Sequence, residues 1–303
     1  MTRVITAGLD GSPESLAAAD WAAREALLRD LPLRLVLAWE PQSYDYPTAS
    51  PPPAGPDLQR DWAQRVTRQA EEDLRRRHAG LRVSADEVDG QPVPVLLAAA
   101  DDAELLVIGS RGLSGVGGFI LGSVALSVVA RATRPVVLVR AEEADTTGRP
   151  SQEPPYREVV LGLDPRRPAD ALIGFAFDAA ARRTSALRVI HGWTPPFYYG
   201  LDSGFGYSSV AVDLEVGAEP AAQEAGVLTD ALRPWREKFP GVEVTEQPVV
   251  GGPAHHLVEA ASGAGLLVVG RRNRGSGIGT HLGPVAHAVM HHVAAPVAVV
   301  PHD

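Results

Sequence analysis

The sequence predicts an α/β protein of two tandem domains, each a five-stranded parallel sheet with helices on both faces. One observation behind this prediction is that short apolar runs alternate with segments of helical periodicity. The other is a long internal repeat. Ile5–Asp10 (ITAGLD) resembles Val159–Asp164 (VVLGLD) at an offset of 154 residues, and Leu105–Gly109 resembles Leu266–Gly270 at an offset of 161. We place the change of offset in the loop after the second strand, where insertions are tolerated best.

In the first half, five apolar runs are predicted to be strands: Val4–Leu9, Leu33–Ala38, about Leu81–Glu87, Leu105–Ile108 and Val136–Val139. Ser12 and Pro13 predict the start of the first helix, because serine is a good N-cap and proline fits the first helical position. Its inner face is expected to carry Leu16, Ala19, Ala23, Ala26 and Leu27. A later helix is predicted over Val124–Ala132, beginning at Ser123.

The expected domains are residues 1–141 and 157–303, joined by a polar linker over 142–156 that contains Pro150, Pro154 and Pro155. Long irregular loops are predicted over 41–56 and 194–220. The second of these loops carries the aromatic runs Pro195–Tyr199 and Phe205–Tyr207. Those aromatic residues either form a lid or partner surface, or lie over their own domain.

Composition excludes several classes of function. The chain has no cysteine, so disulfides, thiolate catalysis and cysteine–zinc sites are excluded. No apolar run approaches the ~20 residues that cross a membrane, and the chain enters a core strand at once, without room for a signal peptide. A cytoplasmic protein with no membrane partner is expected. The net charge of −9 argues against nucleic-acid binding, and the basic run Arg75–His78 is expected to complement the dipole of a helix end.

The most informative motif is Gly109-Ser-Arg-Gly112, then nine residues, then Gly122-Ser123. It connects a buried strand to a helix, so free backbone N–H groups and the helix dipole would meet at the carboxyl end of the sheet, where phosphate binds well. Ser123 could serve as the N-cap or donate its hydroxyl to a phosphate. In the alternative interpretation, the glycines only shape a tight turn, but their number favours an anion site.

Asp10 follows the first strand and has two interpretations. It could contact a ribose, because the strand end faces the crevice where ligands bind in such sheets. It could instead cap the helix that follows. We favour the ribose contact.

The glycine motif, the strand-end sequence Asp10-Gly11-Ser12 and the duplication together resemble the universal stress protein superfamily, in its tandem actinobacterial form. The resemblance covers nearly the whole chain and implies two flavodoxin-like (Rossmann-like) domains that bind ATP. The nucleotide-binding positions that it implies are Gly8, Asp10, Ala38, Gly109, Ser110, Arg111, Gly112, Leu113, Ser114, Gly115, Gly122, Ser123 and Val124. Arg111 would either pair with phosphate or point to solvent.

The second half departs from this pattern. Its matching positions are Gly162, Asp164, Gly270 and Gly283, but Asn273 replaces a glycine and Pro284 replaces the serine. Asparagine tolerates left-handed geometry, whereas proline removes both a hydroxyl and an N–H at the phosphate end. The second half is therefore expected to have lost or weakened nucleotide binding. His281 lies in its loop and could replace some lost contacts.

Other chemistry is not indicated. Lys238 is the only lysine and follows no glycine loop, which excludes a Walker A site. No G-x-G-x-x-G follows the first strand, and no nucleophile elbow is present. His287 and His291 have metal-compatible spacing, but a surface role is favoured and no metal site is expected.

The resemblance implies a regulatory or sensing role in stress adaptation through ATP, with or without Mg²⁺ near Asp10. Little or no hydrolysis is expected, because no general base accompanies the glycine loop. A nucleotide-independent interaction module and an adenine-nucleotide hydrolase or adenylating enzyme remain alternatives. The edge strands Val136–Val139 and Val297–Val300 are expected to pair antiparallel, within one chain or between two, and a homodimer is predicted. The protein partners are not specified by the sequence.

Overall fold

The computed structural model describes residues 3–40, 56–110, 121–141, 157–194, 218–273 and 282–303. The first half consists of β1 (Ile5–Leu9), α1 (Pro13–Arg29), β2 (Leu33–Trp39), α2 (Pro56–Arg77), β3 (Val83–Asp89), α3 (Pro92–Asp101), β4 (Leu105–Gly109), α4 (Ser123–Arg131) and β5 (Val136–Val139). The second half consists of β6 (Val159–Gly162), α5 (Asp170–Arg183), β7 (Leu187–Trp193), α6 (Ala218–Lys238), β8 (Val244–Val250), α7 (Pro253–Ala261), β9 (Leu266–Arg272), α8 (Pro284–His292) and β10 (Val297–His302).

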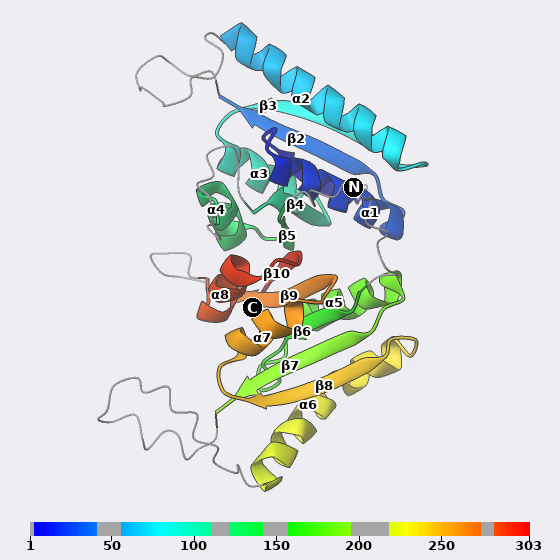
Figure 1. Cartoon of the computed structure of the whole chain (residues 1–303), viewed down its shortest axis with the longest axis vertical. Helices are drawn as coiled ribbons and strands as arrows, with labels where there is room; N and C mark the ends of the chain where they lie inside the picture. The colour runs from blue at the N-terminus through cyan, green and yellow to red at the C-terminus, as the bar shows by residue number, and fades with distance from the viewer. Residues whose placement is uncertain (1–2, 41–55, 111–120, 142–156, 195–217, 274–281) are drawn as a thin grey trace, which may run out of the picture.

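The two halves share one ten-stranded sheet, with strand order β3-β2-β1-β4-β5-β10-β9-β6-β7-β8 (Figure 1). Within each half the strands are parallel, as predicted, and β1 lies between β2 and β4. The halves meet through β5 and β10, which pair antiparallel with Val137 opposite Ala298. Of the two pairings considered for these strands, the structure has the one within a single chain.

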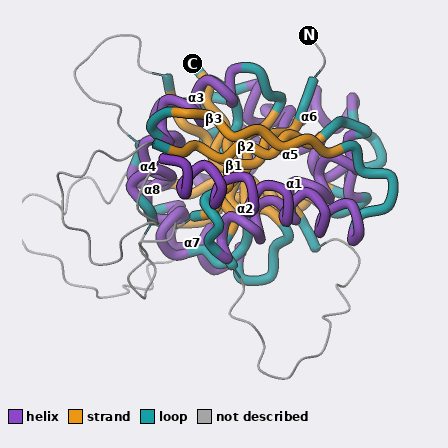
Figure 2. The backbone as a smooth tube through the Cα atoms, turned by 90° about the horizontal axis from the view of Figure 1, so that it is seen from above, coloured by secondary structure: helices purple, strands orange, loops and turns teal. Residues whose placement is uncertain are grey.

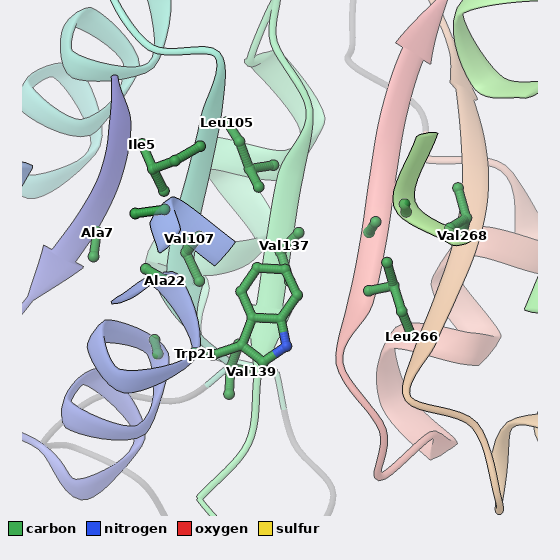
Figure 3. Packing of buried hydrophobic residues seen from close by; sticks show 14 of the residues in the cluster. Ile5, Ala7, Trp21, Ala22, Leu105, Val107, Val137, Val139, Leu266 and Val268 are labelled. Atoms are coloured by element: carbon green, nitrogen blue, oxygen red, sulfur yellow. The ribbon is translucent and has the colours of Figure 1, made fainter. Parts of the chain in front are cut away.

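Helices surround the strands on both faces of the sheet (Figure 2). One core lies under α1, α2, α5 and α6, and the other under α3, α4, α7 and α8. Figure 3 shows the first core beside β5, where Trp21 of α1 lies near Val137 and Val139. Alternate residues of each strand therefore face different helix layers.

The first helix begins where the sequence predicted, and Ala19, Ala23 and Ala26 are buried on its inner face as expected. Ser12 is the N-cap, accepting from the Ser15 N–H at 3.1 Å, and Pro13 is the first helical residue. Leu16 and Leu27, expected inside, are instead 43% and 41% exposed. The buried face consists mainly of alanines together with Trp21: Ala18, Ala19, Ala22, Ala23 and Ala26. Small side chains let the helix approach the sheet closely, and the leucines fall on its flanks.

Several predicted boundaries shift. The third strand begins at Val83 rather than Leu81, because the Leu81 N–H turns back to the carbonyl of His78. Strand β10 continues past Val300 to His302, and α6 begins at Ala218, inside the segment predicted as loop. Residues 41–55 and 195–217 of the two predicted long loops lie outside the described residues, and so do the aromatic runs of the second loop. The predicted linker, residues 142–156, lies outside them too. None of the helices in the described ranges has the length and apolar character that a membrane crossing demands.

Candidate functional site

The fold brings the predicted strand-end residues of the first half to one edge of the sheet. Asp10 directly follows β1, Ala38 lies near the end of β2, and Gly109 ends β4. Because β1 pairs with both neighbours in parallel, these carboxyl ends are adjacent. This is the edge at which parallel α/β sheets bind ligands.

Asp10 organises the turn that leads into α1. One carboxylate oxygen, Oδ1, accepts from the Ser12 N–H at 3.0 Å and from the Ser12 hydroxyl at 2.5 Å. Gly11 between them has a φ of +79°, a conformation that favours glycine. Asp10 therefore supports the capping residue, Ser12, rather than capping the helix itself. Its other oxygen, Oδ2, has no hydrogen bond among the described residues and is available to a ligand.

Because Gly8 has no side chain, α3 can pack closely over the end of β1. A Cβ at this position would lie 2.8 Å from Leu96 of α3 and 3.0 Å from Ile108 of β4. The second half repeats this arrangement, since a Cβ on Gly162 would lie 2.8 Å from Leu257 of α7. Glycine at these two equivalent positions allows a helix to lie close over the strand end.

The amino terminus of α4 lies beside the end of β4. The Gly122 N–H donates to the Ser110 carbonyl at 2.9 Å, and the Ser110 N–H donates to the Val139 carbonyl at 2.8 Å. Gly122, not Ser123, is the N-cap, so no side chain caps the helix, and its first turn has no acidic residue. Ser123 is the first helical residue and is exposed, and Val124 follows it in the first turn. Among the described residues, no side chain accepts from the first backbone N–H groups of α4.

Ser110 adds a buried hydroxyl at this junction. The residue is only 2% exposed, and its Oγ has no hydrogen-bond partner among the described residues. A buried hydroxyl without a partner costs free energy. The predicted site residues Arg111, Gly112, Leu113, Ser114 and Gly115 lie outside the described residues.

The corresponding edge of the second half is built differently. Asp164 is exposed and accepts from the Arg166 N–H at 3.2 Å. The added length of β9 and β10 brings His302 over Gly270, where a Cβ would lie 2.5 Å from the imidazole. Helix α8 has Gly283 as its N-cap but begins with Pro284, which lacks an N–H. This half thus offers fewer donors and a more crowded strand end than the first half.

The second half also contains a buried polar group that the sequence analysis missed. His191 of β7 contacts the Leu163 carbonyl at 3.3 Å and the Glu224 carboxylate at 3.2 Å. Arg166 pairs with the other oxygen of Glu224. His191 and Glu224 are 5% and 6% exposed. At the repeat offsets of 154 and 161 their counterparts are Leu37 and Ala63, both fully buried, and that comparison could have revealed the pair.

Charged contacts also cross between the halves. Glu25 of α1 accepts from Arg29 of the same helix at 2.6 Å and from Arg183 of α5. Arg29 lies over Phe175, 5.8 Å from the ring centroid, and Arg183 lies over Trp21 at 5.6 Å. Burial alone would lower the pKa of Arg29, but Glu25, Asp178 and Glu104 outweigh it and the pKa is raised.

Two further arginines cap helices of the opposite half. Arg140, after β5, donates to the carbonyls of Met290 and His291 at 2.9 and 2.8 Å. Arg271 of β9 donates to the carbonyl of Ala132, the C-cap of α4, at 2.5 Å. Sequence patterns do not reveal such contacts, because they depend on how the halves are joined.

The remaining charged groups do not form a second candidate centre. Arg75, Arg76 and Arg77 occupy the last turn of α2, as predicted, and pair with Glu71, Asp73 and Asp20. The rings of His287 and His291 lie 4.5 Å apart. Within the described parts of the chain, no three histidines or carboxylates gather as metal ligands.

Both halves match the family model described as the universal stress protein family, over residues 1–140 and 155–301. Universal stress protein Rv2005c of Mycobacterium tuberculosis is 31% identical over 299 residues, with 97% of this chain and 96% of the relative covered. Universal stress protein Rv2623 of the same organism is 32% identical over 303 residues, with coverage of 97% and 95%. A crystal structure of a universal stress protein from Archaeoglobus fulgidus has the same fold, with a TM-score of 0.69 at 17% identity over 99% of this chain and 98% of that one.

Proposed function

This chain belongs to the universal stress protein family, and from that premise we propose that its first half binds ATP as a regulatory or sensing ligand, with little or no hydrolysis. The observation that carries the proposal is the uncapped amino terminus of α4. Helix α1 is capped by Ser12 and has Glu14 in its first turn, whereas α4 has neither kind of group. A phosphate would satisfy its free N–H groups and interact favourably with its dipole.

The remaining contacts follow from the strand ends. Asp10 offers its second carboxylate oxygen to a ribose hydroxyl or to a Mg²⁺ ion that arrives with the nucleotide. The backbone near Ala38 and Gly109 faces the same edge of the sheet. The buried hydroxyl of Ser110 belongs to this junction and would gain a partner from a bound ligand.

A proline substitution tests the phosphate site. We expect the unmodified protein, stripped of nucleotide, to bind one Mg-ATP per chain in isothermal titration. Ser123→Pro should weaken that binding about tenfold or more, because a hydroxyl and an N–H are lost at the phosphate end. The fold should survive, since proline fits the first helical position and α8 already begins with Pro284.

The matched control exchanges the same two residue types in the other half. Pro284→Ser should leave ATP affinity and stoichiometry unchanged, because Asn273 still replaces a glycine and His302 still crowds the strand end at Gly270. Two sites per unmodified chain would contradict the proposed loss of binding in the second half. No binding at all would favour a nucleotide-independent interaction module.

We also propose that the protein forms a homodimer. Since β5 and β10 pair with each other, a second chain would have to use another surface. Size-exclusion chromatography with light scattering at micromolar concentration should then give twice the mass of one chain. A single-chain mass throughout would refute the homodimer without affecting the proposal on ATP.

A further inference from the structure

We propose that Arg271, contributed by the second half, is a positioning residue for the phosphate site of the first half. The inference rests on the proposed function, because it concerns the affinity of that site for phosphate. Arg271 has no hydrogen bond to the described residues of the site, and its contact is with the carbonyl of Ala132. It would act through α4, whose amino terminus lies beside Ser110 and whose C-cap accepts the arginine.

The contact between Arg271 and α4 is buried on both sides. Arg271 is 8% exposed, and its Nη2 lies 2.5 Å from the carbonyl oxygen of Ala132, which is 1% exposed. Burial lowers the pKa of Arg271 below its ordinary value. Among the described residues no carboxylate pairs with this guanidinium. The counterpart of its charge is therefore the negative end of the α4 dipole.

A cation at this end of α4 also favours an anion at the other end. Helix α4 has nine residues and is about 14 Å long. At the effective dielectric constant of ~20 that suits protein sites, a unit charge at that distance changes the binding of a singly charged phosphate roughly sevenfold. The contact also fixes the C-cap of α4 against β9, and with it the position of the helix amino terminus.

The two contacts between the halves come from different positions of the repeat. At the offset of 161, the counterpart of Arg271 is Ser110. The reverse contact is made by Arg140, which caps α8 of the second half through Met290 and His291. Arg271 thus acts on α4, and Arg140 acts on α8.

The test measures ATP, AMP and adenosine binding to the full chain by isothermal titration. Arg271→Gln should weaken ATP and AMP roughly five- to tenfold and leave adenosine binding nearly unchanged, because only phosphate senses the lost charge. Arg271→Lys keeps the charge and should retain most of the affinity.

Each outcome separates the two proposals. An equal loss for adenosine and ATP in Arg271→Gln, or an equal loss of ATP affinity in Arg271→Lys, would reduce Arg271 to a structural contact and overturn this inference. Unchanged ATP affinity in Arg271→Gln would overturn it as well, while leaving the proposed function intact. Failure of the unmodified protein to bind ATP would overturn both. Thermal unfolding of each variant, with Arg271→Lys as reference, verifies that folded proteins are compared.

Discussion

Replacing Glu25 with alanine is expected to lower the free energy of unfolding by about 4 kcal/mol. The Glu25 side chain is 2% exposed and receives two guanidinium groups, of Arg29 and Arg183, each 5% exposed. Without it, Arg29 keeps Glu104 and Asp178, each at 2.9 Å. Arg183 keeps only the Ala179 carbonyl and the face of Trp21 among the described residues. A buried charge that loses its carboxylate costs far more than an exposed one.

Denaturant unfolding of the full chain measures this loss. The matched control is Glu71→Ala, which removes a pair between neighbouring turns of α2 in which Arg75 is 54% exposed. Its expected cost is about 0.5 kcal/mol or less, since solvent replaces an exposed partner. Equal losses in the two variants would mean that water reaches Arg183, contrary to its burial.

Glu224→Ala is expected to cost about 3 kcal/mol. The substitution leaves His191 buried beside a single oxygen acceptor, the Leu163 carbonyl at 3.3 Å, and leaves a cavity under α6. Arg166 can turn to solvent, because its side chain is already 60% exposed. The expected loss of stability therefore comes from His191, which loses its contact with Glu224, and from the lost packing.

The sequence of the first half suggests a double variant that should regain the stability lost in Glu224→Ala. His191→Leu combined with Glu224→Ala recreates Leu37 and Ala63, the apolar pair at the equivalent positions. Exchanging both members of a buried polar pair for apolar residues is often neutral or stabilising. The double variant should recover to within about 1 kcal/mol of the unmodified protein. A double variant as unstable as Glu224→Ala alone would show that the second half does not accommodate the packing of the first.

Local signals predicted the parts of the fold that depend on neighbouring residues. Ser12 and Pro13 gave the start of α1 correctly, because capping involves only the first turn. Apolar runs located all the strands of the first half, with errors of one or two residues at their ends. Leu16 and Leu27 were wrongly expected in the core. Alanines fill the contact between α1 and the sheet, and helical periodicity alone does not show that the two leucines lie beside that contact rather than in it.

The site was predictable to the extent that strand ends in a parallel sheet converge. That rule placed Asp10 and Gly109 together, and the resemblance added Ala38. The pair Gly122-Ser123 marked the start of α4 at Ser123, although Gly122 and not Ser123 is the N-cap. The contacts of Arg140, Arg271 and Glu25 could not be predicted, because they form only after two distant segments are joined through β5 and β10. The pair of His191 and Glu224 was accessible in principle, by comparing the two halves position by position.

Covalent joining of the halves removes a constraint that a symmetric dimer would impose. In a dimer of identical chains, any substitution at a helix start changes both sites at once. Here β5 and β10 pair within one chain, so proline can stand at 284 while serine remains at 123. The pairing also persists at any dilution, because the effective concentration of one half near the other is set by the chain itself. The second half can therefore change in sequence without altering the residues of the site in the first half, while it stays bound to the first half through β5 and β10.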